Sequence, residues 1–259
     1  MIRSVQRALN ILEALKNKIP EKSIKELSHE LALSPSTIYR LLTTLKNRGY
    51  IEKNTETSKY RLGLKVFEVG SAVLKRMSLR EEAKPVLMDL AKKTGDSAHL
   101  IVQYEDEALC LERINGDNYL KALFLVVGGR MPMHIGASPR VLLAYLPEPE
   151  IDKIITTKKL TPWTKKSITR SDILKQNLRQ IKEQGYALSF EDATEGVAAI
   201  GAPVRNHTEK VIAAISVGGP CIHFKSPHLN ELIELVKRAA KKLSKNLGYV
   251  DDKIIDAII

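Results

Sequence analysis

The sequence predicts an α+β protein that begins with a winged helix-turn-helix domain and continues into a larger domain with a mainly antiparallel sheet. Apolar residues recur at helical spacing over the first quarter of the chain, and strand-like runs follow from Asp96 onward. The 259 residues also suffice for two unequal domains. The expected boundaries are 1–62 for the winged domain, 63–77 for a linker helix, 78–250 for the second domain and 251–259 for a tail.

Composition places the chain among globular proteins. Hydrophobic residues make up 44% and charged residues 27% of the chain, which is neither a disordered nor a membrane composition. The longest apolar run, 211–224, is broken by Gly218, Gly219 and Pro220, and it is shorter than the roughly 18 residues of a membrane span. Because the N-terminus also lacks an apolar signal core, we expect a cytoplasmic protein without a membrane partner.

No metal or cofactor is expected. Cys110 and Cys221 form no CxxC pair, and we interpret both as small buried hydrophobes in a reducing compartment. His223 and His228 lie on either side of Pro227, a poor geometry for two ligands on one helix.

Basic charge is concentrated at the N-terminus. Residues 1–62 hold twelve Lys and Arg against six Asp and Glu, so this segment carries +6 of the net charge of +11. Per residue it is about four times more basic than the rest of the chain. A basic segment attracts phosphate backbones and anionic surfaces, although a Lys-rich solvated surface would have the same charge.

Three helices are predicted in the first fifty residues. Residues 4–17 carry apolar side chains at i, i+3, i+4 and i+7. Ser23 with Glu26 three residues later is a capping-box pattern and predicts the start of the second helix. Ser34 followed by Pro35 predicts the start of the third, because serine caps helices and proline suits the first helical position.

A hairpin is predicted directly after the third helix. Gly49 ends that helix, and two short strands at 50–53 and 59–62 enclose the polar stretch 54–58. Three helices followed by a hairpin are the winged form of the helix-turn-helix.

The exposed face of the third helix is suited to reading DNA. It carries short hydrogen-bonding side chains and one arginine, which can reach base edges and phosphates. Basic residues on the hairpin and the first helix are placed to hold phosphates on either side. The candidate DNA-binding residues are Arg3, Arg7, Ser34, Ser36, Thr37, Arg40, Thr44, Lys59 and Arg61. The same face would also suit a solvated helix of a protein-interaction module.

The rest of the chain alternates between helical and strand-like patterns. The helices are expected at 63–75, 78–93, 139–146, 148–156, 171–184 and 227–247. The strands are expected at 99–104, 109–114, 120–127, 186–190, 198–204 and 211–217. Residues 249–259 are expected to form a tail or a short extra helix. This domain is large enough for its own core and a ligand cavity.

Six segments together resemble the IclR family of bacterial and archaeal regulators. In the first domain they are SVQRALNILEAL (4–15), LSPSTIYRLLTTLKNRGYIEK (33–53) and YRLGLKVFEVG (60–70). In the second they are GGRMPMHIGASPRVLLAYLP (128–147), GYALSFEDATEGVAAIGAPV (185–204) and AAISVGGP (213–220). The resemblance covers nearly the whole chain apart from the last dozen residues.

The resemblance implies a transcription regulator in which a GAF-like effector-binding domain controls a winged DNA-binding domain. It implies a homodimer or a dimer of dimers on double-stranded DNA with a palindromic operator, and a small-molecule effector. Carried over by position, the effector cavity is lined by Met131, Ala137, Ser138, Ser189, Ala199, Gly201, Ser216 and Gly218. Ala199, Gly201 and Gly218 would equally suit ordinary close-packed strands.

This chain departs from the family pattern at four places in that region. Pro139-Arg140 stands where the family usually has Gly-Lys, and Asp192 replaces a common Glu. Ser189 stands where many members have Asp, and Ala199 where many have Cys. These changes make the implied pocket less acidic, and a small organic acid or an aromatic-derived acid is the expected effector. Backbone N–H groups and small hydroxyls suffice to bind a carboxylate.

An enzyme and a protein-interaction adaptor are the two other classes of function to compare with a regulator. An enzyme would need a nucleophile with a base, or paired carboxylates, in a cleft. The sequence has no nucleophile elbow, P-loop, dinucleotide fingerprint or HExxH motif, so we expect no enzyme. The alternative to a regulator is a winged-helix adaptor that binds proteins and has no DNA sequence preference.

Overall fold

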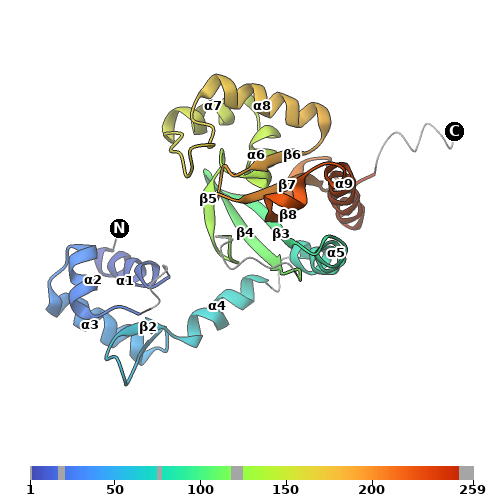
Figure 1. Ribbon diagram of the computed structural model, residues 1–259. Coiled ribbons are helices and arrows are strands. Elements are labelled where there is room, and N and C mark those ends of the chain that lie inside the picture. The colour runs from blue at the N-terminus through green and yellow to red at the C-terminus, as the bar shows by residue number, and fades with distance from the viewer. Residues whose placement is uncertain (1, 17–20, 75–77, 118–124, 251–259) are drawn as a thin grey trace. The chain divides into compact units, whose positions relative to one another are not determined.

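The computed structural model describes residues 2–16, 21–74, 78–117 and 125–250 (Figure 1). The chain divides into two compact units, Met1–Met77 and Ser78–Ile259. Within the described ranges, none of the helices has the length and apolar character needed to cross a membrane.

The first unit is a winged helix-turn-helix, as predicted. Its elements are α1 (Arg3–Ala14), α2 (Ile24–Leu31), α3 (Pro35–Asn47), β1 (Ile51–Lys53), β2 (Tyr60–Leu62) and α4 (Leu64–Leu74). The strands β1 and β2 pair antiparallel to form the wing. Side chains from α1, α2, α3 and the wing share one core, whose buried members include Ile11, Leu15, Leu27, Ile38, Leu42 and Ile51.

Local capping interactions start α2 and α3. The predicted capping box of α2 is confirmed: the Glu26 N–H donates to Ser23 Oγ at 3.2 Å, and the Ser23 N–H donates to Glu26 Oε2 at 2.6 Å. Hydrogen bonds from the backbone N–H and the side chain of Ser23 to the Glu26 carboxylate lower the pKa of Glu26 to about 2. At α3, Ser34 Oγ accepts the Thr37 N–H at 3.3 Å, and Pro35 occupies the first turn. The start of α3 is therefore fixed by a contact between residues three positions apart in the sequence.

The second unit is built on a six-stranded antiparallel sheet in the order β5-β4-β3-β8-β7-β6. The strands are β3 (Ser97–Tyr104), β4 (Glu107–Ile114), β5 (Arg130–Pro132), β6 (Ala187–Phe190), β7 (Val197–Arg205) and β8 (Val211–Pro220). The helices are α5 (Ser78–Thr94), α6 (Ala137–Ala144), α7 (Glu148–Thr157), α8 (Ser171–Gln184) and α9 (His228–Asn246), with a 3-10 turn η1 (Cys221–Phe224).

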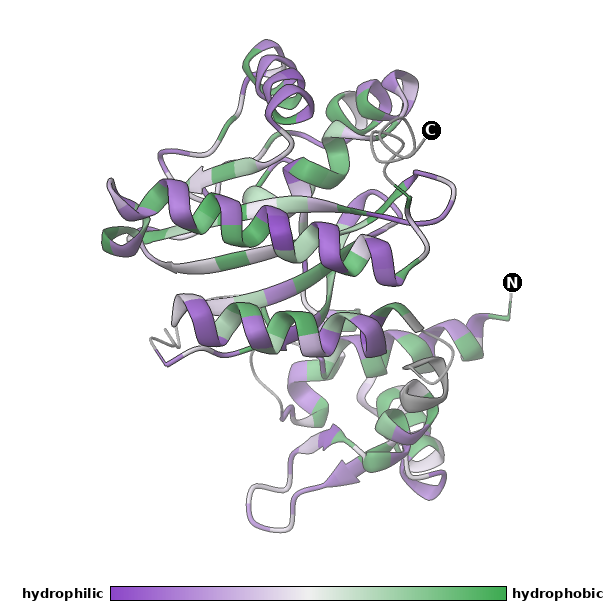
Figure 2. Cartoon of the chain, turned by 90° about the vertical axis from the view of Figure 1, so that its right-hand side faces the viewer, coloured by the Kyte–Doolittle hydropathy of each residue, from purple (hydrophilic) through white to green (hydrophobic). Residues whose placement is uncertain are grey.

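Helices cover both faces of this sheet. The long helices α5 and α9 pack side by side against β3 and β7 (Figures 1 and 2). Figure 2 shows that each alternates hydrophilic and hydrophobic residues along its length, the pattern of a helix with one buried face. The helix α6 lies on the other face, over β7 and β8, with α8 packed on it. All eight residues of α6 are buried, so α6 is the central support of that layer.

Two expectations differ from the observed elements, and a third falls outside the described residues. The strand predicted at 120–127 overlaps residues 120–124, which lie outside the described ranges, and the described strand is β5 instead. A turn precedes β5, because the Gly129 N–H donates to Val126 O and Gly128 has a φ of +79°. The helix predicted from residue 139 begins at Ala137. The proposed tail residues 251–259 also lie outside the described part of the chain.

Candidate ligand cavity and DNA interface

A cavity lies between the sheet and the first turn of α6. Its floor consists of two neighbouring rows of cross-strand partners, which point to the same face of a sheet. In one row His99 pairs with Ser216. The adjacent row joins Gly218, Ala199 and Ser189. Most of these side chains are small, so the sheet is hollowed beneath α6.

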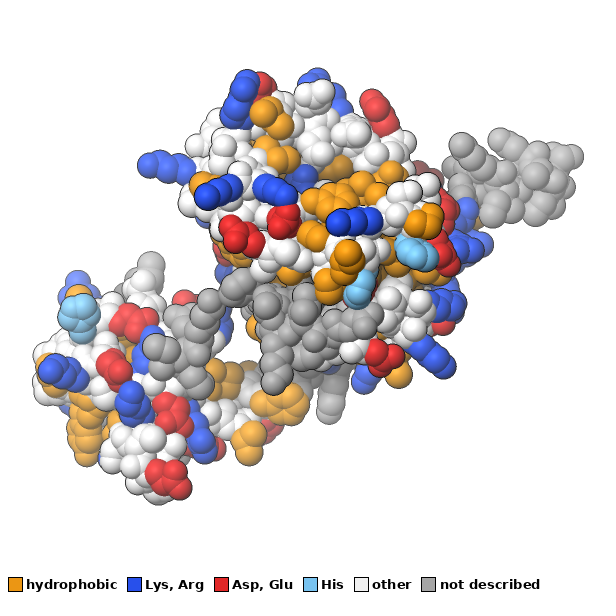
Figure 3. Space-filling view, in the orientation of Figure 1, with side chains coloured by type: hydrophobic (Ala, Val, Ile, Leu, Met, Phe, Trp, Pro, Cys, Tyr) orange, Lys and Arg blue, Asp and Glu red, His pale blue; other side chains and the backbone are white. Residues whose placement is uncertain are grey.

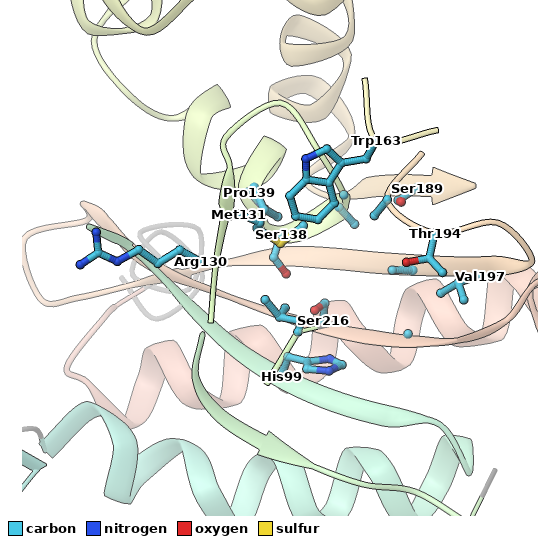
Figure 4. Close-up of a pocket in the computed structure, with 16 residues that line it drawn as sticks. His99, Arg130, Met131, Ser138, Pro139, Trp163, Ser189, Thr194, Val197 and Ser216 are labelled. Carbon is cyan, nitrogen blue, oxygen red and sulfur yellow. The ribbon is translucent and has the colours of Figure 1, made fainter. Parts of the chain in front are cut away.

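The cavity has a volume of about 80 Å³, which is room for a small organic molecule rather than for one water. Figure 4 shows Trp163 above it, His99 below it, and Ser138 and Ser216 between them. Its lining consists of His99, Leu125, Arg130, Met131, Gly136, Ala137, Ser138, Pro139, Trp163, Ser189, Ala193, Thr194, Val197, Ala199, Ser216 and Gly218.

Seven of the eight residues expected to line the effector site lie in this lining: Met131, Ala137, Ser138, Ser189, Ala199, Ser216 and Gly218. Gly201 does not. A Cβ added there would lie 2.9 Å from the Ser138 nitrogen and 3.1 Å from the Ala137 carbonyl carbon. At Gly201, β7 therefore lies close to the backbone of α6, and the missing side chain lets that helix pack onto the sheet.

The first turn of α6 presents hydrogen-bond donors to the cavity. Gly136 precedes the helix and has no side chain to cap it, so the N–H groups of Ala137 and Ser138 have no partner within the helix. The Ser138 hydroxyl is buried and has no hydrogen-bond partner in the described structure. Helix N-termini carry partial positive charge and attract anions. This end of the cavity is therefore suited to a carboxylate.

The start of α6 is held in place by a buried ion pair. Arg140 Nη2 lies 2.9 Å from Asp192 Oδ2, and both side chains are 5% exposed. The guanidinium also donates to Gly136 O at 3.0 Å, Asn177 Oδ1 at 2.8 Å and Leu188 O at 2.7 Å. The sequence pattern presented Arg140 and Asp192 as separate departures from a family motif; in the structure they are partners.

Asp192 connects this ion pair to the cavity wall. Its carboxylate accepts the Gly136 N–H at 3.2 Å and the Ser189 hydroxyl. Because the Ser189 hydroxyl already donates its hydrogen bond to Asp192, Ser189 contributes mainly to the shape of the cavity.

Several lining residues carry no sequence signal for a ligand site. Trp163 comes from the loop between α7 and α8, Thr194 from the β6–β7 connection and Val197 from the start of β7. Arg130 also borders the cavity, but in Figure 4 its guanidinium points away from it. That group lies 3.5 Å from Glu107 Oε2 and stacks over the Tyr104 ring at 4.4 Å. The carboxylate site on α6 therefore does not use this arginine.

His99 is the most deeply buried titratable residue of the cavity. Its Nε2 atom is buried without a hydrogen-bond partner among the described residues. Burial, and secondarily the positive charge of Arg113 on the neighbouring strand, lower the pKa of His99 to about 3. The imidazole is neutral at pH 7.

The lowered pKa of His99 makes the second unit less stable in acid. Between about pH 6.5 and 3 the unfolded chain binds a proton at His99 that the folded chain excludes, so stability falls as the pH is lowered through that window. We expect His99→Gln to flatten the pH dependence of urea unfolding, followed by the fluorescence of Trp163, the single tryptophan. The exposed His228 provides the control, since His228→Gln should leave the profile unchanged. Equal profiles for wild type and His99→Gln would contradict this assignment.

The predicted DNA-reading face of α3 is open to solvent. Ser34, Ser36, Arg40 and Thr44 are exposed, and Thr37 is partly exposed. The Thr44 hydroxyl donates to Arg40 O at 3.0 Å. Tyr39, which the sequence pattern did not single out, is 56% exposed on the same helix. Serine and threonine hydroxyls, a phenol and a guanidinium are all suited to contacts with DNA.

The predicted phosphate contacts on the wing already have acidic partners. Lys59 Nζ lies 3.4 Å from Glu26, and Arg61 lies 3.3 Å from Glu52 and 3.6 Å from Glu21. Figure 3 shows basic and acidic side chains next to one another on this unit. Lys59 and Arg61 would have to exchange carboxylates for phosphates, whereas Arg40 forms no ion pair within the described part of the chain.

The two remaining candidate DNA-binding residues lie on α1. Arg3 is exposed and Arg7 partly exposed, both on α1. No cluster of three or more His, Cys, Asp or Glu that could hold a metal occurs among the described residues. Cys110 is buried, as interpreted from the sequence, and Cys221 is partly buried.

Comparison with known proteins gives matches along almost the entire chain. Residues 4–55 match the family profile of the IclR helix-turn-helix domain, and residues 71–245 match that of the bacterial transcriptional regulator IclR C-terminal domain. The HTH-type transcriptional regulator XynR of Escherichia coli is 36% identical over 250 residues, which are 96% of this chain and 98% of XynR.

Solved structures share the fold over the same length. The Thermotoga maritima IclR structure has a TM-score of 0.78 and 27% identity, covering 96% of this chain and all of that one. An IclR homologue from Microbacterium hydrocarbonoxydans, complexed with 4-hydroxybenzoate, has a TM-score of 0.83 and 24% identity, covering 94% and 98%.

Proposed function

This chain belongs to the IclR family of DNA-binding transcriptional regulators controlled by an effector, and from that premise we propose that its effector is a small organic acid bound beneath α6. The observation that carries the proposal is the N-terminus of α6, which has no side-chain cap and whose first residues, Ala137 and Ser138, line an apolar cavity. That the Microbacterium homologue was crystallised with an aromatic hydroxy acid supports the same class of ligand.

We propose that α3 reads the operator and that the wing and α1 hold the backbone. Arg40, exposed and without a carboxylate partner among the described residues, is the side chain best placed to pair with guanine. Ser34, Ser36, Thr37 and Thr44 contact phosphates or bases near the start of the helix. The backbone contacts come from Arg3, Arg7, Lys59 and Arg61.

We propose a homodimer on a palindromic operator, with 1–62 as the DNA-binding domain, 63–77 as the linker and 78–250 as the effector domain. Exposed apolar side chains support self-association of the first unit: Ile2, Val5 and Leu9 on or just before α1, and Leu64 and Phe67 on α4. Burying such residues against a second copy is favourable. Sedimentation measurements on the purified protein test this directly.

The coupling we propose is a shift between two spacings of the DNA-binding domains. Two recognition helices of a dimer must lie about one turn of DNA apart, roughly 34 Å, to reach both half-sites. Binding of the acid at α6 favours one arrangement of the dimer, and α4 carries the change to the winged domains. Effector binding can raise or lower operator affinity, because the coupling free energy between two sites can be positive or negative.

One experiment tests the DNA-binding site and the effector site together. Genomic fragments are enriched with the purified protein at physiological salt, and the enriched fragments are footprinted. The protected site is then titrated with and without a panel of carboxylic acids. A protected palindrome whose affinity changes with an acid supports the proposal. Enrichment without sequence preference would contradict operator recognition, and an operator affinity that no acid changes would contradict the effector assignment.

Replacing Arg40 tests the recognition helix by itself. We expect Arg40→Ala to weaken binding to the footprinted operator by about 1–3 kcal/mol and to relax the base preference at one position. The control is Lys59→Ala, which should weaken binding to all sequences more evenly and make the salt dependence shallower. Fluorescence anisotropy at several salt concentrations separates the two effects. If Arg40→Ala binds the operator as wild type does, another side chain reads it.

A further inference from the structure

A buried ion pair lies where the chain enters the second unit. That unit begins at Ser78, and Nη2 of Arg80, in the first turn of α5, lies 2.9 Å from Oε2 of Glu112 on β4. The Glu112 side chain is only 8% exposed. Such a pair seldom adds net stability, but separating its partners leaves an uncompensated charge in the interior. Arg80 and Glu112 must therefore move together.

A β-bulge aims Glu112 at α5. On β3, Leu100 pairs with Glu112, and the next residue, Ile101, pairs with Cys110. Leu111 is therefore an extra residue in β4. Cys110 belongs to the core beneath α6, and in a regular strand Glu112, two residues later, would point to that same face. Bulges redirect side chains in this way and are frequent beside functional sites.

The residue after Glu112 lies on the opposite face of the sheet, on the side of the cavity. Arg113 is the cross-strand partner of His99, which belongs to the cavity lining. Its guanidinium donates to O of Leu125, another lining residue, at 3.2 Å. Its backbone N–H donates to Glu112 Oε1 at 3.1 Å. A continuous series of contacts thus leads from the cavity wall through β4 to the first turn of α5.

We propose that Glu112 and Arg113 couple the effector cavity to the linker, with Arg80 as the positioning residue at the start of α5. The inference rests on the proposed function, since it takes the cavity as the effector site and 63–77 as the linker. It goes further by naming the route within the second unit. A molecule that displaces Leu125 also moves Arg113 and, with it, the bulged segment of β4. Arg80 then follows the Glu112 carboxylate, and the first turn of α5 changes its position.

The ion pair has a second arrangement open to it. The Nε atom of Arg80 is buried and has no hydrogen-bond partner in the described structure, and leaving such an atom unpaired is costly. A guanidinium can bind a carboxylate through two nitrogens, so a shift of Glu112 toward Nε would satisfy this atom. An element with two discrete arrangements is what carries coupling between distant sites.

Hydrogen exchange of the full-length protein, measured by mass spectrometry with and without the footprinted operator duplex, tests this route. Coupling is reciprocal, so operator binding must act on the cavity if an effector in the cavity acts on operator binding. The operator duplex is therefore the probe, whichever molecule fills the cavity. In wild type we expect it to change the exchange of peptide 78–90 and of the two cavity-side peptides, 107–114 and 125–139, by about fivefold or more.

Glu112→Gln interrupts the route between α5 and β4. The substitution keeps the shape of the side chain but removes the charge that holds it to Arg80. We expect the operator-induced change to persist at 78–90 and to fall below about twofold in the two cavity-side peptides. The double variant Arg80→Gln/Glu112→Gln leaves no uncompensated charge, so it provides the same test if thermal unfolding shows that Glu112→Gln does not fold.

Glu107→Gln is the matched control. It makes the same chemical change on the same strand, in an ion pair with Arg130 whose side chains are 40% and 37% exposed. Because this pair does not involve α5, the operator-induced changes should equal those of wild type.

Two results would overturn the inference. If the ion pair is only structural, Glu112→Gln raises exchange equally with and without operator, and the operator-induced change in the cavity-side peptides survives. If wild type binds the operator without any change in those peptides, the route does not exist, although operator recognition stands. Failure of every carboxylic acid to bind would contradict the acid effector and leave this measurement unaffected, so the two failures are distinguishable.

Discussion

Arg140→Met is expected to lower the free energy of unfolding of the second unit by about 3–5 kcal/mol. The substitution keeps most of the side-chain volume but removes the charge that compensates Asp192, whose carboxylate is 5% exposed. It also removes the donors to Gly136 O, Asn177 and Leu188 O. Breaking one partner of a buried pair costs more than the pair itself contributes, because the remaining charge stays buried.

Urea unfolding followed by Trp163 fluorescence measures this loss, since the tryptophan belongs to the same unit. The chain offers a matched control in Arg170, which pairs with Asp172 at 2.6 Å but with side chains 69% and 64% exposed. Arg170→Met should cost less than about 1 kcal/mol. Adding Asp192→Asn to Arg140→Met should recover part of the loss, because no uncompensated charge remains. Equal losses for Arg140→Met and Arg170→Met would show that the buried pair does not hold α6.

The winged domain could be predicted almost completely from the sequence, because its signals are local. Ser23 and Glu26 lie three residues apart, as do Ser34 and Thr37, and each pair forms a cap. The same holds for α8, whose predicted range 171–184 matches Ser171–Gln184. Such local interactions can be predicted without knowing the rest of the fold.

The cavity could be predicted only in part, because its polar contacts depend on strand register. Resemblance to a family placed seven residues at the site, but not His99. Only the pairing of β3 with β8 places His99 beside Ser216, more than a hundred residues away in sequence. The Arg140–Asp192 pair likewise spans fifty-two residues and joins a helix to a loop. Periodicity reveals which face a residue occupies, but it carries no information about its partner across a sheet.

Gly201→Ala is expected to weaken binding of the effector acid by about tenfold to a hundredfold, which corresponds to roughly 1–3 kcal/mol of overpacking. The added Cβ would lie 2.9 Å from the backbone nitrogen of Ser138, and a backbone atom in the buried α6 cannot rotate away as a flexible side chain can. The first turn of α6 must therefore move, and the N–H groups proposed to hold the carboxylate move with it. Operator binding without effector should be preserved, because α3 is in the other unit.

Gly218→Ala distinguishes displacement of α6 from simple loss of cavity volume. Gly218 also lines the cavity, but a Cβ there would meet nothing closer than 3.6 Å. It therefore fills space without pressing on the helix, and it should reduce acid affinity less than Gly201→Ala. Titrations of operator affinity against acid concentration compare the two variants. If both lose the response to the same extent, volume alone controls binding, and the close approach of β7 to α6 has no part in effector recognition. If only Gly201→Ala loses the response to acid, effector binding depends on the position of the first turn of α6.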